Sequence, residues 1–139
     1  MHIQELKKIN RETLLTGRSF PEHLLAMIAE GVVSYQIDLV SGQATYFGKH
    51  QADTCSSDIA RRFRLAVGTE WQLEDVKVAI SSIQRNQLTY EEFLKAIAAA
   101  GVNRYIVDIS NTNITYFGSQ RQHVEPFPPA LCDLVRSKN

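Results

Sequence analysis

The chain has 139 residues, of which 44% are apolar and 22% charged, and its 15 basic side chains balance its 15 acidic ones. This length and composition suit one globular domain with its own hydrophobic core, and they argue against a disordered chain. The balanced charge gives no general attraction to nucleic acid or to an anionic membrane surface, and no apolar run approaches the roughly 20 residues that span a bilayer. We therefore expect a single domain over residues 1–139 that binds neither nucleic acid nor membrane.

The N-terminal residues indicate where in the cell the protein is located, and the cysteines and histidines indicate whether it has disulfides or a metal site. The first residues are too polar for a secretory signal, so we expect a cytoplasmic protein in which Cys55 and Cys132 are reduced thiols. Neither cysteine belongs to a Cys-x-x-Cys pair, and the four histidines are scattered without the spacing of metal ligands. We expect no metal site and no cofactor.

Two helices are predicted in each half of the chain, because apolar residues recur there on one helical face. The predicted helices are 3–14, 20–30, 73–83 and 90–100. Both shorter helices open with a capping-box pattern, Ser-Phe-Pro-Glu or Thr-Tyr-Glu-Glu. Gly31 and Gly101 are expected to end them, since glycine adopts the left-handed conformation after a helix at little cost.

A pair of strands is predicted after each shorter helix. Apolar and polar residues alternate with a period of two, which indicates half-buried strands. The predicted strands are 33–39, 43–48, 105–109 and 113–118, with turns at 41–42 and 111–112. If these turns have two residues, Leu39 faces Ala44 and Ile109 faces Ile114.

Residues 20–50 and 90–120 align at an offset of 70 without a gap. Twelve of the 31 positions are identical, including both copies of Thr-Tyr-Phe-Gly, where chance would give roughly two. We infer an internal duplication of a helix–helix–strand–strand unit, with repeats at 1–50 and 71–120. Two copies are too few for a solenoid. The predicted fold class is therefore α+β, with the helices packed on one face of a largely antiparallel sheet.

A linker at 51–70 separates the repeats, and a tail at 121–139 follows them. The apolar residues of the linker fit either a strand or a helix. In chain order we predict a short helical turn, a strand, an extended proline-rich stretch and a final helix, at 57–61, 62–67, 126–129 and 130–136.

The repeated Thr-Tyr-Phe-Gly places its two aromatic residues on opposite faces of the sheet. Cross-strand neighbours share a face, so the tyrosines at 35, 46, 105 and 116 are expected to lie together on the core side. The phenylalanines then lie on the opposite, more polar side. The candidate binding surface consists of Phe47, Phe117, Ile106, Gln36, Arg104, Asp38 and Asp108. A shift of one residue in register would exchange the two faces.

Two interpretations of the phenylalanine face stay open. The linker or the tail folds over it, or it binds a partner or ligand. We favour a non-enzymatic binding or self-associating module, whose partner is a second copy of the chain (a homodimer), another protein or a small molecule.

The alternative is a small enzyme, such as a hydrolase, with a site between the repeats. Asp38 and Asp108 would then meet near a pseudo-twofold axis, where like charge raises one pKa and creates a general acid. Each aspartate also precedes a predicted turn and faces a threonine, which favours a local hydrogen-bonding role. Cys55 has His50 and Asp53 nearby in sequence, but this closeness does not place a base beside the thiol in space.

The second repeat resembles a known family in the positions Gly101, Val102, Tyr105, Val107 and Asp108, which are followed by Tyr116 and Phe117. Proteins with this pattern are small uncharacterised bacterial proteins with a fold called YbcV-like, and some carry the label "phage envelope protein". The resemblance covers about residues 3–125 and is clearest in the second repeat. The family has no established activity, so the resemblance implies a fold and a bacterial source but no site residues.

Overall fold

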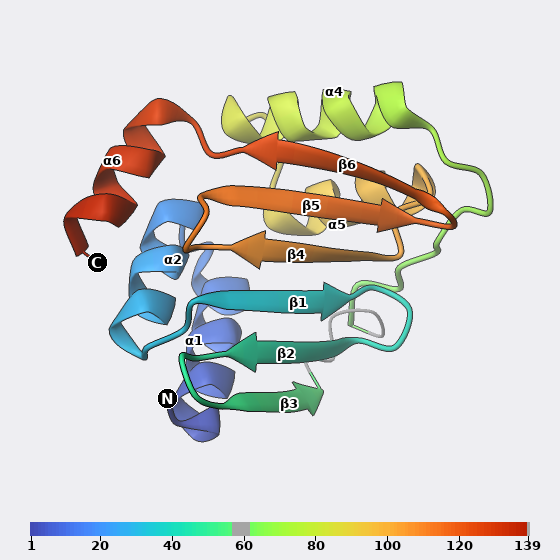
Figure 1. The fold of residues 1–139 in the computed structure, drawn as a ribbon. Helices are drawn as coiled ribbons and strands as arrows, with labels where there is room; N and C mark the ends of the chain where they lie inside the picture. The colour runs from blue at the N-terminus through green and yellow to red at the C-terminus, as the bar shows by residue number, and fades with distance from the viewer. Residues whose placement is uncertain (57–61, 139) are drawn as a thin grey trace.

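Two antiparallel strands from opposite halves of the chain, β1 (Ser34–Asp38) and β4 (Arg104–Asp108), lie at the centre of the fold. The computed structural model describes residues 1–56 and 62–138, and six strands of this part form one sheet in the order β3-β2-β1-β4-β5-β6. The other strands are β2 (Gln43–Phe47), β3 (Ala52–Ser56), β5 (Asn113–Gly118) and β6 (Arg121–Pro126). Every neighbouring pair is antiparallel, and the predicted α+β class is confirmed (Figure 1).

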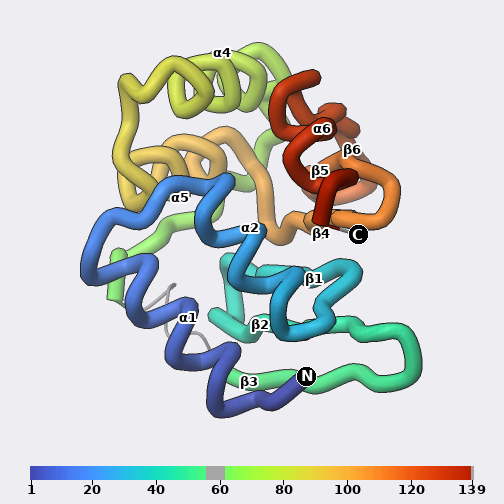
Figure 2. Tube along the Cα trace, turned by 90° about the vertical axis from the view of Figure 1, so that its left-hand side faces the viewer, coloured from blue at the N-terminus to red at the C-terminus, as the bar shows by residue number. Residues whose placement is uncertain are grey.

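Helices cover one side of this sheet. The described helices are α1 (Ile3–Thr16), α2 (Phe20–Ala29), α4 (Leu73–Gln84), α5 (Tyr90–Ala99) and α6 (Pro129–Lys138). Figure 2 shows α1, α2, α4 and α5 together on one side of the strands, as predicted. Helix α6 packs beside α2 at one end of the sheet. None of the helices described here combines the length and apolar character that a bilayer crossing requires.

The predicted caps set the ends of the two short helices. At α5, Glu92 N donates to Thr89 Oγ1 (3.1 Å) and Thr89 N donates to Glu92 Oε1 (2.9 Å), which completes the capping box. At α2 the Ser19 hydroxyl accepts from the backbone of Glu22, so that half of the box forms. Gly31 and Gly101 follow these helices with φ values of +84° and +99°, as the sequence predicted.

The predicted two-residue turns are wrong, because each turn between the paired strands has four residues. The observed register pairs Ile37 with Ala44 and Val107 with Ile114, two positions away from the predicted pairing. The Asp38 carboxylate accepts from the backbone N–H groups of residues 40 and 41, at 2.8 and 2.9 Å, and these bonds hold the wider turn. A shift of two positions preserves the faces of a strand, so the predicted separation of tyrosine and phenylalanine survives the error.

The linker and the tail supply the two edge strands, which the sequence prediction missed. Strand β3 pairs with β2, and β6 pairs with β5. Backbone hydrogen bonding explains why these segments become strands. Without β3 and β6, the strands β2 and β5 would each expose a row of unpaired backbone groups. The strand predicted at 62–67 is absent, and the buried Phe63 lies in a turn there instead. The helical turn predicted at 57–61 lies outside the described residues. The predicted final helix is confirmed as α6, which starts one residue early at a proline.

The order of elements recurs in the two halves. Helices α2 and α5, and strands β1 and β4, have bounds that differ by 70 residues. Gln36 pairs with Ile106 at the centre of the sheet, so the register is symmetrical about this pair. The unit in each half is helix–helix–strand–strand–strand, one strand longer than predicted. Its origin in a duplication stays an inference from the sequence.

Aromatic residues dominate the core between the sheet and the helices. The side chains of Tyr35, Tyr46, Tyr105 and Tyr116 are at most 6% exposed, which confirms the predicted core face. Tyr35 and Tyr46 have ring centroids 6.0 Å apart, as do Tyr105 and Tyr116. The Tyr90 hydroxyl shares a hydrogen bond of 2.6 Å with that of Tyr105, and Asn10 donates to the Tyr46 hydroxyl. Burial raises the pKa of Tyr90 to about 12, so this layer stays uncharged at neutral pH.

Trp71, the one tryptophan of the chain, holds the start of the second half against two glycines. A Cβ on Gly118 would lie 2.4 Å from the Trp71 ring, and a Cβ on Gly101 would lie 2.4 Å from the Glu70 carbonyl oxygen. The Gln72 N–H also donates to the Ala100 carbonyl (2.8 Å). The segment before α4 therefore packs so closely that both positions need glycine.

We predict that Gly118→Ala destabilises the protein by about 2 kcal/mol or more, because the new methyl group overlaps the Trp71 ring. The matched control is Gly48→Ala, at the same place in the first half. There the nearest atoms to a new Cβ are 3.4 Å away or farther, so its effect should stay within about 1 kcal/mol. Urea denaturation followed by Trp71 fluorescence measures both values. Equal effects of the two substitutions would contradict the packing described for Trp71.

His23 is a buried titratable group on the core side of α2. Its side chain is 8% exposed, shares a hydrogen bond of 2.7 Å with the Thr13 hydroxyl and lies edge-on to Tyr35. Burial, with a smaller contribution from the charge of Arg18, lowers the pKa of His23 to about 4. The native state therefore holds a neutral imidazole across the range in which an unfolded histidine takes up a proton.

We predict an acid sensitivity that originates at His23. Below about pH 6.5 the His23 imidazole binds a proton in the unfolded state but stays neutral in the native state. The free energy of unfolding therefore falls as the pH drops towards 4. The loss from this group approaches about 3 kcal/mol. The control is His23→Phe, since phenylalanine stands at the equivalent position 93. Its stability should fall less steeply between pH 6.5 and 4, measured by urea denaturation at each pH. Parallel curves for the two proteins would rule out this role.

Candidate binding surface

The side of the sheet opposite the helices bears all seven residues of the predicted surface, and we call it the open face. It is formed by alternate residues of the strands, whose other residues point into the core. Figure 1 looks onto this face, and none of the described helices crosses it. Within the described part of the linker and tail, the chain forms edge strands, a turn and α6 rather than a cover for the phenylalanines.

Phe117 is shielded by a neighbouring arginine. The Arg104 guanidinium lies over its ring, with Cζ 3.8 Å from the ring centroid. Arg104 Nη1 also donates to Gln36 Oε1 at 3.1 Å, which holds the guanidinium in place. Register explains the contact, because Arg104 lies directly opposite Phe117 in the β4–β5 pair. Three of the predicted residues thus form one cluster on the open face.

Phe47 occupies the equivalent position in the first half but has no such shield. The residue opposite it is Ser34, whose short side chain cannot extend over a ring. The Phe47 side chain is 37% exposed, whereas Phe117 is half-buried. On its other side Phe47 faces Ala52, whereas Phe117 faces Gln122, so the first half has short side chains on both sides of its ring.

The apolar part of the open face continues across the second half. Ile106 lies opposite Thr115, which in turn lies opposite Val124 on the edge strand β6. Val124 is 48% exposed, and sequence reasoning missed it because residues 121–126 were assigned to the tail. In the first half the corresponding row is polar, and the hydroxyls of Thr45 and Thr54 share a hydrogen bond of 3.0 Å.

The structure does not bring Asp38 and Asp108 together. Asp38 pairs with Arg104 at one end of the β1–β4 pair, and Asp108 pairs with Ser34 at the other. Four residue steps along a strand separate the two positions by roughly 13 Å. Each carboxylate holds its own turn, since Asp108 accepts from the N–H and the side-chain amide of Asn111 much as Asp38 accepts in the first half. The sequence predicted that each aspartate would lie opposite a threonine. Each carboxylate instead makes these hydrogen bonds within its own turn.

Cys55 lies on β3 and faces the core opposite Ala44. Burial, together with the charge of Asp53, raises the pKa of its thiol despite the opposing effect of Lys7. The thiol therefore stays protonated at neutral pH. His50 lies exposed in the turn before β3. Among the described residues, no cluster of three or more histidine, cysteine or acidic side chains is placed to hold a metal ion.

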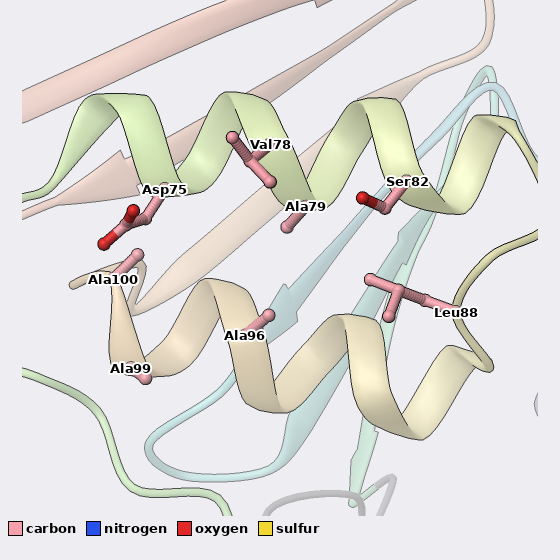
Figure 3. Close-up of a pocket in the computed structure, with 8 residues that line it drawn as sticks. All are labelled: Asp75, Val78, Ala79, Ser82, Leu88, Ala96, Ala99 and Ala100. Carbon is pink, nitrogen blue, oxygen red and sulfur yellow. The ribbon is translucent and has the colours of Figure 1, made fainter.

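Two hollows lie away from the open face, and the sequence pattern indicated neither. The first, about 380 Å³, runs between α4 and α5 and is lined mainly by small side chains such as Ala79, Ala96 and Ala99 (Figure 3). The second, about 310 Å³, lies between the end of α2 and the β2–β3 turn. Neither hollow contains a residue of the predicted surface.

Comparison with known proteins places the chain in a family but assigns no activity. None of the curated proteins matches it. A family model with the description "Protein of unknown function (DUF1398)" matches residues 3–125, the same span as the resemblance noted in the sequence. That match confirms a family of uncharacterised proteins, while the YbcV-like name and the phage label stay predictions. Because the model covers most of the chain, the protein belongs to the DUF1398 family.

Proposed function

We propose that this protein is a non-enzymatic module that associates with a second copy of itself through the open face. The observation that carries the proposal is the exposed ring of Phe47 on a six-stranded sheet face that none of the described helices covers. The same face bears Arg104 over Phe117, two strands away from Phe47, and aromatic residues and arginine are both enriched at protein–protein interfaces. The DUF1398 family and the YbcV-like resemblance assign no activity, so the proposal rests on this surface alone.

A second copy is the occupant favoured by the complementarity of the two halves. The flat guanidinium of Arg104 has two faces, and Phe117 occupies one of them. The other face can stack on Phe47 of a second copy, whose own Arg104 stacks in return. Such reciprocal contacts define an isologous twofold interface, which is the commonest arrangement of homo-oligomers. Two sheets packed face to face would exclude water from both aromatic rings.

The size of the face indicates reversible association. A sheet of six strands, each about five residues long, presents roughly 500 Å². One partner in a standard-size interface contributes about 800 Å², so this face falls in the weak or transient class. We therefore expect a dissociation constant in the micromolar range or above, rather than a permanent dimer.

No observation in residues 1–56 and 62–138 favours the enzymatic alternative between the repeats. The carboxylates of Asp38 and Asp108 lie at opposite ends of a strand pair, and each is engaged in its own turn. The open face remains the surface on which the predicted residues meet.

The proposal predicts that wild-type protein forms dimers with rising concentration and that Phe47→Ser/Phe117→Ser weakens dimerisation at least tenfold. Sedimentation equilibrium from about 10 μM to 1 mM measures both constants. The matched control is Leu15→Ser/Val78→Ser, which removes two exposed apolar side chains from the helices α1 and α4 and should dimerise as the wild type does. Circular dichroism checks that all three proteins are folded.

A second variant tests whether dimerisation depends on the absence of an arginine over Phe47. Ser34→Arg copies into the first half the arginine that covers Phe117, so it should cover Phe47 within the same chain and weaken dimerisation without loss of stability. A wild type that stays monomeric up to 1 mM would contradict the proposal, and so would dimers of unchanged strength in both open-face variants.

A further inference from the structure

The hollow between α4 and α5 differs in charge from the matching surface of the first half. Its described walls are Asp75, Val78, Ala79, Ser82, Leu88, Ala96, Ala99 and Ala100, and among them Asp75 alone is charged (Figure 3). The residues 70 positions earlier, on α1, on α2 and beside them, are Glu5, Lys8, Ile9, Glu12, Arg18, Ala26, Ala29 and Glu30. Five of these are charged. The second half therefore has small or apolar side chains at four positions where the first half has charged ones.

Larger side chains stand at the matching positions of the first half. Ile9 is buried where the second half has the smaller Ala79. The Arg18 guanidinium donates to the Glu12 carboxylate at 2.9 Å, and this ion pair joins the last turns of α1 to the residue before the cap of α2. Serine and leucine stand at the equivalent positions of the second half, so that bridge is missing there. The space of about 380 Å³ lies where these side chains are smaller or uncharged.

The remaining charge, Asp75, lies at one end of the hollow and is exposed. Within residues 1–56 and 62–138 its carboxylate has no ion-pair partner. The lysines of the two helices, Lys77 and Lys95, pair with Glu74 and Glu91 instead, at 3.9 and 2.8 Å. Any partner that covers the hollow removes water from the Asp75 carboxylate, which is costly unless the partner brings a positive charge to it. The site thus selects a cationic occupant.

We propose that this hollow binds a helix of a partner protein that presents a branched aliphatic side chain with a lysine or arginine one turn away. Ile9 identifies the aliphatic group, because it is the side chain buried at the place of Ala79 in the other half. Asp75 lies four residues, or about one turn, before Ala79 on α4, which sets the spacing of the cation. An amphipathic helix in a groove between two helices is a recurring form of peptide recognition. The site lies on the helices and does not rest on self-association through the open face.

The first test is an NMR titration of the full chain with a helical peptide of about 16 residues, built from alanine and glutamine with one isoleucine and one lysine a turn apart. Saturable shifts are expected at the amides of Asp75, Ala79 and Ala96, with a dissociation constant of about millimolar because two side chains provide the contact. A matched peptide with glutamate in place of the lysine should bind about fivefold more weakly. A second control peptide, with serine in place of the isoleucine, should also bind more weakly.

Three variants, checked for folding by circular dichroism, locate the site. Ala79→Ile copies the isoleucine of the first half, so it should occupy the hollow and abolish the shifts. Asp75→Asn, at an exposed position, should fold and bind the lysine and glutamate peptides equally. Phe47→Ser/Phe117→Ser should bind the lysine peptide as the wild type does, which separates this site from the open-face dimer.

Four outcomes would each overturn the proposal. They are the absence of saturable shifts at these amides, equal binding of the lysine and glutamate peptides by the wild type, equal binding of the isoleucine and serine peptides, and an unchanged preference for lysine in Asp75→Asn. An unchanged response of folded Ala79→Ile would overturn it as well. If Ala79→Ile does not fold, the comparison of Asp75→Asn with the wild type decides the question alone.

Discussion

The antiparallel pairing of β1 with β4 is the constraint on which the rest of the molecule depends. It joins strands that lie 70 residues apart in the chain, and it merges two three-stranded units into one sheet. Because Gln36 lies opposite Ile106, the four tyrosines of both halves come to the same side of this sheet and form one core under a shared layer of helices. Without this pairing β1 and β4 would each become an edge strand with a row of unpaired backbone groups.

Small differences between the two halves give the surface its character. Arginine opposite Phe117 and serine opposite Phe47 leave one ring shielded and the other bare. A Cβ on Gly118 would lie 2.4 Å from the Trp71 ring, whereas the atoms nearest to a Cβ on Gly48 are 3.4 Å away or farther. The second half is therefore the more closely packed at both of these places.

Sequence reasoning succeeded where the physics is local. Helix ends follow from capping residues and from glycines with positive φ, and the faces of strands follow from a period of two that survived an error of two positions in register. It failed where a segment depends on a distant partner. Residues 52–56 and 121–126 carry weak strand signals and become strands because β2 and β5 offer unpaired edges. The enzymatic alternative required the two aspartates to meet, but the register of β1 against β4, which no local pattern encodes, places them at opposite ends.

By itself the amino-acid sequence determined the fold class, the helix–helix–strand–strand order, the buried tyrosines and the outward phenylalanines, since each follows from periodicity and capping within a few residues. Only the tertiary structure decided which strands lie at the centre and the edges, which phenylalanine is shielded, and how closely Trp71 packs on Gly118. Those outcomes depend on contacts between residues far apart in the chain, such as Trp71 with Gly118 within the second half and Gln36 with Arg104 between the halves, and no local sequence pattern encodes their geometry.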